Sequence, residues 1–155
     1  MKRSFLATSM LLFGVTGSPL LAQVADDEVN ALSAAVTGIL TKVPPGKTAI
    51  VYNDRSAELS KKLGLKIGKK IEHETSHLDC QYDATNKRQK CALKGVSSLV
   101  NIGRTSVSGD SADAYLFIER PTGSSFQPIE TNGYVVKLAR VQGVWTVVSI
   151  ELTLI

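Results

Sequence analysis

The chain is poor in the residues that build metal and redox centres, since its 155 residues include only two cysteines and two histidines. Cys80 and Cys91 are too far apart for the Cys-x-x-Cys spacing of redox or zinc sites. There is one tryptophan, with four tyrosines and four phenylalanines. The sequence has no internal repeat and no low-complexity tract. These absences argue against a cysteine-based centre and against a repeat protein.

A long apolar run occurs only near the start of the chain, from Phe5 to Leu21. Two basic residues precede it, and Ala22 follows as a small residue suited to cleavage. This order is typical of a secretory signal peptide, so we expect residues 1–22 to be removed and residues 23–155 to form one exported domain, periplasmic or extracellular. A retained anchor is the alternative, but the uninterrupted part of the run is short for a membrane span. No cysteine follows it that could carry a lipid.

Neither sign of charge dominates the chain, which has 18 basic and 14 acidic residues. Losing two basic residues with the signal peptide leaves 16 against 14, a net charge of +2. The excess is concentrated in residues 61–94, where nine basic residues face four acids. The segment is interpreted as a solvated surface or as a patch for a protein or an anionic surface, and the lack of interleaved aromatic residues other than Tyr82 argues against nucleic acid. The candidate patch residues are Lys61, Lys62, Lys66, Lys69 and Lys70.

Export makes the two cysteines expected partners in a disulfide, because isolated pairs in oxidising compartments are usually bonded. Closing so short a loop contributes roughly 2–3 kcal/mol. If Cys80 faces Cys91 across an antiparallel hairpin, Leu78 faces Leu93, and residues 84–87 form a four-residue loop.

The two histidines lie in the segment IEHETSHLDC, in the pattern His73-Glu74-x-x-His77. In zinc metallopeptidases this pattern lies on a helix, where two imidazoles one turn apart bind zinc and the glutamate acts as base. His73 and His77 are therefore the alternative metal ligands and Glu74 the alternative catalytic base. No third ligand is evident, although Glu119 and Glu151 are the nearest substitutes.

The secondary structure of residues 71–80 decides between these interpretations. On a strand, residues four apart lie roughly 13 Å apart and cannot share a zinc ion. The hairpin pairing from Cys80 back to Leu78 places His77 opposite Lys94 as a solvent-side residue. We therefore favour an extended conformation at His77, with both histidines exposed, and assign no metal or catalytic residue.

The remaining pattern predicts an α+β fold. Residues 26–41 carry an apolar stripe at Val29, Leu32, Val36, Ile39 and Leu40, typical of a helix. A strand is predicted at Thr48–Tyr52 and a second helix through Ala57 and Leu63. Strands at 98–107 and 112–119, then 133–141 and 144–155, form two hairpins. In the last strand we expect Val144, Val148 and Leu152 to share a buried face beneath the first helix. The predicted architecture is an N-terminal helix or helices packed on a curved antiparallel β-sheet, with one hairpin disulfide.

This order of elements resembles the nuclear-transport-factor-two-like superfamily, also called cystatin-like or ketosteroid-isomerase-like. The resemblance rests on Gly109-Asp110-Ser111-Ala112 opening a strand and on the hairpin YVVKLARVQGVWTVVSIEL. It implies the fold and a cavity, because the superfamily includes enzymes and non-catalytic binding modules. No site residue is transferred.

The favoured hypothesis is a non-enzymatic exported domain without a cofactor that binds a partner or a small apolar ligand in its concave face. The alternative is a zinc-dependent metallopeptidase that uses His73, Glu74 and His77. An acid-base enzyme is disfavoured because no catalytic constellation can be assigned.

Overall fold

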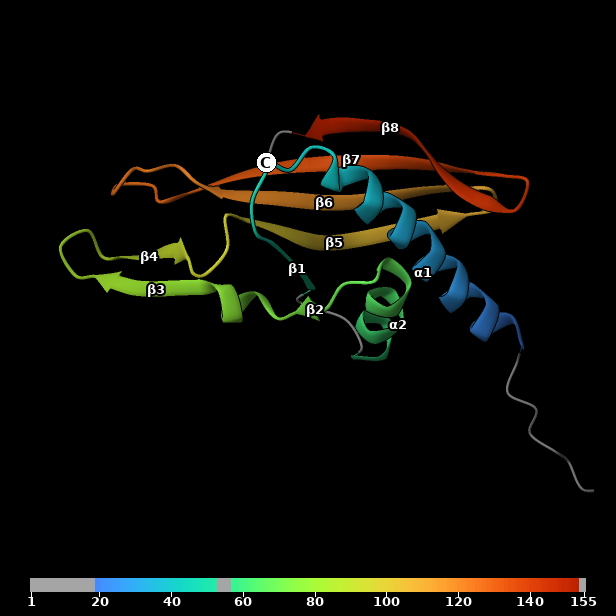
Figure 1. Ribbon diagram of the computed structural model, residues 1–155, viewed down its shortest axis with the longest axis horizontal. Coiled ribbons are helices and arrows are strands. Elements are labelled where there is room, and N and C mark those ends of the chain that lie inside the picture. Colours follow the sequence, from blue (N-terminus) through green and yellow to red (C-terminus); the bar gives the residue numbers. More distant parts are fainter. Residues whose placement is uncertain (1–18, 53–56, 154–155) are drawn as a thin grey trace, which may run out of the picture.

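The computed structural model describes residues 19–52 and 57–153 and confirms the predicted α+β class, with two helices packed on a mostly antiparallel sheet (Figure 1). The predicted signal peptide lies outside these residues, except that residues 19–22 begin the first helix. None of the helices in the described ranges combines the length and hydrophobicity needed to cross a bilayer. The elements are α1 (Pro19–Leu40), β1 (Thr48–Tyr52), α2 (Ala57–Ile67), β2 (Ile71–Glu72), the 3₁₀ helix η1 (Glu74–His77), β3 (Leu78–Asp83), β4 (Arg88–Leu93), β5 (Ser98–Ser108), β6 (Ser111–Pro121), β7 (Ile129–Val141) and β8 (Val144–Thr153).

Six strands form the main sheet in the order β2-β1-β5-β6-β7-β8. β1 runs parallel to β2 and to β5, and the other neighbours are antiparallel. Both predicted hairpins of this sheet are present, β5–β6 and β7–β8. At the second turn Gln142 and Gly143 have φ angles of 51° and 80°. These left-handed conformations give a two-residue turn the twist that matches its flanking strands.

α1 packs across one face of the sheet and supplies a third of the buried residues of the main hydrophobic core. Its predicted stripe is buried at Val29, Leu32, Val36 and Ile39, while Leu40 is only partly buried. Each fully buried side chain of this kind contributes roughly 1.5–3 kcal/mol relative to exposure. Buried side chains therefore fill the space between α1 and the central strands, and a hollow remains between α1 and β8. The buried side chains from the sheet are Ile50, Tyr52, Val100, Ile102, Ala112, Ala114, Leu116, Ile118, Val136, Leu138 and Trp145.

The face assignment predicted for the last strand is wrong. Trp145 is buried in the core and Val147 packs against it, whereas Val144, Val148 and Leu152 are exposed. The reason is a β-bulge: Lys137 pairs with Ser149 and the next residue, Leu138, pairs with Val147, so Val148 is an extra residue. Because side chains alternate along a strand, the inserted residue reverses the alternation and returns Ile150 to the core.

β3 and β4 form a separate two-stranded sheet beside the main one (Figure 1). Their register confirms the predicted hairpin, with Cys80 opposite Cys91 and Leu78 opposite Leu93. The Cys80–Cys91 disulfide is formed. At the base of the hairpin the Lys94 amide donates to the His77 carbonyl at 2.8 Å. These two bonds hold the strands of the hairpin together. Other contacts determine where the hairpin lies relative to the main sheet.

Candidate functional site

The histidine pattern is neither on an α-helix nor on a strand. His73 has extended backbone angles, φ −84° and ψ 140°, and caps η1, which ends at His77. The extended conformation favoured for His77 is therefore wrong by one residue, because β3 begins at Leu78. A 3₁₀ helix forms here since His73 accepts a bond from the Thr75 amide, which supports a single tight turn.

Both imidazoles make contacts within their own segment. His73 Nδ1 lies 2.9 Å from Thr75 Oγ1, and His77 Nε2 lies 2.7 Å from Glu72 Oε2. The expectation that both histidines are exposed is wrong for His77, whose side chain is only 13% accessible. Lys70 and then His77 bond the Glu72 carboxylate, and together they hold its pKa below the ordinary value. The segment is thus braced internally by an ion pair.

This geometry does not provide the α-helical turn that the metallopeptidase motif needs, because His73 precedes the short 3₁₀ helix in an extended conformation. In the ranges that the structure describes, no group of three or more His, Cys, Asp or Glu side chains could hold a metal ion. Glu119 and Glu151, the substitutes considered for a third ligand, do not form such a group with the histidines. The described residues therefore do not bring a third ligand to the histidine pattern.

Glu74 instead lies in a cleft of about 490 Å³ between the β3–β4 hairpin and the main sheet, here called the hairpin cleft. β4 forms one wall, the loop after β6 forms the other, and Glu119 of β6 lies in the lining beside Glu74. The lining is Glu74, Leu78, Arg88, Gln89, Lys90, Cys91, Glu119, Phe126, Gln127, Pro128, Ile129 and Thr131.

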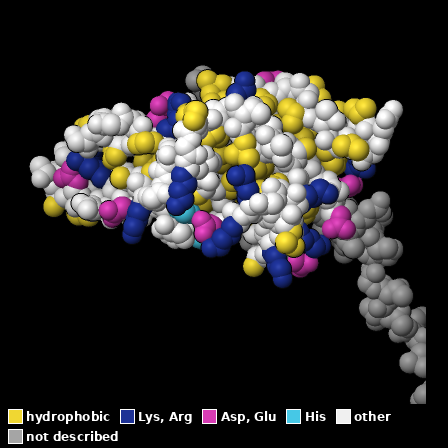
Figure 2. All heavy atoms as spheres, in the orientation of Figure 1, with side chains coloured by type: hydrophobic (Ala, Val, Ile, Leu, Met, Phe, Trp, Pro, Cys, Tyr) yellow, Lys and Arg dark blue, Asp and Glu magenta, His cyan; other side chains and the backbone are white. Residues whose placement is uncertain are grey.

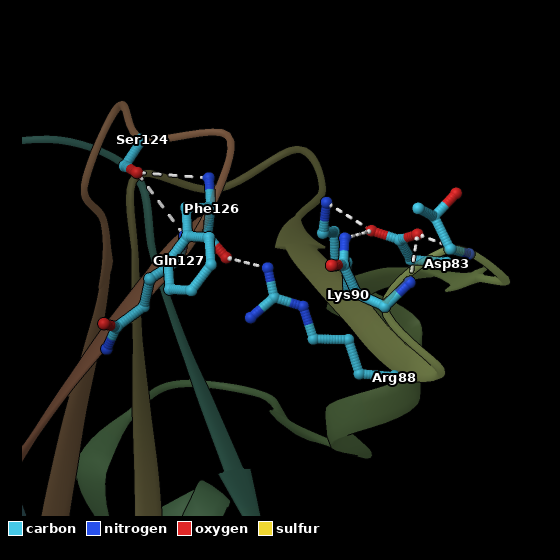
Figure 3. Close-up of polar contacts among 8 residues, drawn as sticks. Asp83, Arg88, Lys90, Ser124, Phe126 and Gln127 are labelled. Carbon is cyan, nitrogen blue, oxygen red and sulfur yellow. Dashed lines mark hydrogen bonds and ion pairs between the residues drawn. The ribbon is translucent and has the colours of Figure 1, made fainter.

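Arg88 holds the hairpin against the far wall of the cleft. Figure 3 shows its side chain extending from β4 toward the loop that carries Phe126. Nη2 donates to the Phe126 carbonyl at 3.2 Å, and the guanidinium carbon lies 4.0 Å from the centre of the Phe126 ring. Ser124 Oγ accepts from the Phe126 and Gln127 amides, so the loop is itself ordered by local bonds. The hairpin cleft is therefore bounded by two walls joined at Arg88.

Asp83 braces the end of the hairpin (Figure 3). Its carboxylate lies 2.7 Å from Lys90 Nζ and accepts from the backbone amides of Thr85 and Asn86. Lys90 and then Asn86 hold the pKa of Asp83 well below its ordinary value. Lys90 is thus already paired at the outer side of the hairpin.

Glu119 is the least expected residue of the cleft. Its exposed fraction is only 8%, although it lies on the face of the sheet opposite α1, beside Leu99. Burial, and then the negative charge of Glu74, raise the pKa of Glu119, while a hydrogen bond from Asn101 lowers it. A cation between the two carboxylates would relieve their repulsion and the desolvation of Glu119. No sequence motif marks Glu119, because its burial depends on the hairpin that covers it.

The five lysines of the predicted anionic-partner patch divide into two groups on α2 and after it. Lys62 Nζ pairs with Asp26 of α1 at 3.3 Å and with Glu58 at 3.6 Å. Lys66 lines a hollow between α1 and β8. The other three, Lys61, Lys69 and Lys70, line a groove of about 640 Å³ on the outer side of α2. Only this second group shares one surface.

Comparison with protein-family models and with curated proteins finds no match to this chain.

Proposed function

We propose that this protein is an exported, non-catalytic binding domain that holds its ligand in the hairpin cleft. The ligand class that fits the lining is a molecule, or a segment of a partner, that carries an amine or guanidinium next to an apolar group. Glu74 and Glu119 supply the negative charge, and Leu78, Phe126 and Ile129 supply the apolar contact.

The burial of Glu119 is the observation that carries this proposal. A carboxylate that is buried beside a second negative charge destabilises the fold at neutral pH, and such groups concentrate at functional sites. A bound cation would offset both effects and gain charge-assisted hydrogen bonds.

The two basic residues of the cleft are engaged elsewhere. Arg88 lies over Phe126, and Lys90 pairs with Asp83. Phe126 is 69% exposed, and its outward position suits an aromatic or aliphatic group of the ligand.

Export is part of the proposal. The disulfide is consistent with an oxidising compartment, and the order of the first 22 residues supports secretion through a signal peptide. We likewise propose membership of the nuclear-transport-factor-two-like superfamily, on the leading helix and the closing hairpin β7–β8. The parallel pairing of β1 with β5 and the separate β3–β4 sheet are features specific to this chain.

A titration with phenethylammonium tests the proposal, with 2-phenylethanol as the neutral probe of nearly the same shape. The amine is expected to shift the amide resonances of Glu74, Glu119 and Phe126 in the ¹H–¹⁵N spectrum, and the alcohol is expected to bind far more weakly. The Glu119→Gln substitution should weaken amine binding about tenfold or more, since hydrogen bonds to charged groups contribute about 1.5–3 kcal/mol.

Glu151→Gln is the matched control, because it removes the same charge from an exposed carboxylate that pairs with Lys137 on β7. It should leave the affinity unchanged. Equal binding of amine and alcohol, or equal losses in the two variants, would contradict a cation site in the hairpin cleft.

A further inference from the structure

We infer that the outer side of α2 is a docking surface for an anionic lipid bilayer. This surface is defined by Lys61, Leu65, Lys69 and Lys70, and it lies on a different part of the molecule from the hairpin cleft. The inference therefore does not depend on the proposed ligand of that cleft.

The surface combines an exposed apolar side chain with positive charge. Leu65 is 77% exposed, the most exposed large apolar side chain described in the structure. Lys61 precedes it by one helical turn, and Lys69, which follows the end of α2, lines the same groove. Figure 2 shows dark blue and yellow side chains interspersed over the region of α2. A single exposed leucine is common on protein surfaces, but lysines surround this one, and a bilayer offers both phosphates for the lysines and an apolar layer for Leu65.

Two glycines bring the last lysines onto the helix. Gly68 has a φ of 65°, which ends α2 and turns the chain back. The Lys69 amide then donates to the Gly64 carbonyl at 3.1 Å. A side chain at Gly64 would have its Cβ 2.9 Å from the Lys69 carbonyl oxygen, so only glycine lets the two segments approach this closely. The lysines of the groove therefore share one surface because the chain folds back at Gly68, and not only because they are close in sequence.

The charges of the groove are available to a bilayer. Among the described residues Lys61 and Lys69 make no ion pair, while Lys70 Nζ pairs with Glu72 at 2.7 Å. The groove floor consists of the small residues Ala57, Ser60, Gly64 and Gly68, which leave room for a lipid headgroup beside Leu65. The complementary partner is a surface with closely spaced phosphates and an apolar layer beneath them. An anionic bilayer supplies both, whereas a soluble polyanion supplies only the charge.

Co-sedimentation of the full chain with vesicles tests the inference. Vesicles of phosphatidylcholine containing 30% phosphatidylglycerol, on the order of natural anionic content, are compared with pure phosphatidylcholine. The apolar N-terminal segment, with Lys2 and Arg3, is present in every variant, so the differences between variants report on the α2 surface. We expect stronger binding to the anionic vesicles, falling as salt is raised.

Matched variants locate the binding surface. Lys61→Gln/Lys69→Gln should reduce the preference for anionic vesicles about 25-fold, on the estimate of about fivefold per lysine. Leu65→Ser should weaken binding to anionic vesicles several-fold at constant net charge, because the apolar contact is lost. Lys42→Gln/Lys47→Gln, which alters two exposed lysines elsewhere, should have little effect.

Three outcomes would overturn the inference. Equal losses in the two double variants would show that net charge alone drives binding. An unchanged affinity in Leu65→Ser would remove the apolar contact. Binding to soluble heparin with no preference for anionic vesicles would identify the surface as a polyanion site instead.

Discussion

At the residue scale, the burial of Glu119 makes its negative charge energetically unfavourable in the folded protein. Glu119 shares one face of β6 with Phe117 and Tyr115. This face is turned away from α1, and carboxylates in such a position are usually solvated. The hairpin covers this position, and the pKa of Glu119 rises because water no longer stabilises its charge. Its protonation state is consequently coupled to folding.

We predict that Glu119→Gln removes a pH-dependent destabilisation. A carboxyl group with a raised pKa in the folded protein contributes stability that is fully present below its unfolded pKa and is lost as the pH rises through the folded value. The free energy of unfolding of the wild type should therefore fall relative to that of the variant between about pH 4 and pH 8. Urea unfolding of both proteins across this range measures the difference.

Glu151→Gln provides a comparison of opposite sign. The pKa of Glu151 is lowered, first by its hydrogen bond with Lys137 and then by Ser149, so its contribution is present above the unfolded pKa and is lost as the pH falls. If the two variants change with pH in the same direction, the burial of Glu119 is not the cause of its effect.

The pairing of the hairpin residues could be predicted from the sequence, whereas the lining of the cleft could not. The register from Leu78 to Asp83 could be predicted because the disulfide partners and the loop length are local features. The 3₁₀ helix at Glu74–His77 could not be predicted, since it depends on contacts made by His73 and Glu72. Glu74 and Glu119 are far apart in the sequence but close in the structure, and no local sequence pattern predicts their proximity.

At the element scale, the β3–β4 hairpin is bound to the rest of the protein in few places. Its own strands pair only with each other, and it is connected to the body by Arg88 and by Leu93, which packs against the buried cluster that includes Leu99. An isolated two-stranded hairpin is marginal in water, so the disulfide is needed to keep its two strands together. The walls of the hairpin cleft therefore depend on a covalent bond outside the main core.

We predict that Cys80→Ser/Cys91→Ser loosens the hairpin and leaves the sheet intact. Replacing both residues avoids a free thiol. Because the link contributes roughly 3 kcal/mol, hydrogen exchange of the amides from Gln81 to Gln89 should accelerate about 100-fold. Exchange in β6 and β7 should change little, as measured by mass spectrometry or NMR. Equal acceleration in the two regions would mean instead that the hairpin and the sheet unfold as one unit.

Helices and strands could be predicted from the sequence where apolar residues recur at regular spacing. The stripe of α1 and the hairpins β5–β6 and β7–β8 were predicted because apolar spacing and turn residues are read within a short window. The bulge at Val148 escaped prediction since the alternation of β8 looked unbroken. The parallel pairing of β1 with β5 brings together segments separated by α2 and the hairpin, and only tertiary packing determines it.

At the scale of the whole molecule, stability depends on the layer between α1 and the sheet. Leu116 on β6 is fully buried there, whereas Leu152 on β8 is 64% exposed. The two leucines are chemically identical and differ only in their surroundings. They provide a direct measure of how much the core contributes.

Leu116→Ala is predicted to lower the free energy of unfolding by about 2–5 kcal/mol, from lost burial and the cavity left behind. Leu152→Ala should lower it by less than about 0.5 kcal/mol, as is usual for surface positions. Chemical denaturation of both variants at the same pH measures the two values. A large loss in Leu152→Ala would indicate that another copy or partner covers β8 in solution.

The bulge at Val148 also affects how the protein meets other chains. β8 is the last strand of the sheet, so one row of its backbone amides and carbonyls faces outward, next to the exposed Val144 and Val148. An uninterrupted apolar edge of this kind recruits further strands and leads to aggregation. The bulge divides the edge into two short stretches whose hydrogen-bonding groups are out of step, and an incoming strand cannot pair with both. The extra residue at Val148 thus makes the edge of β8 a poor template for edge-to-edge strand pairing.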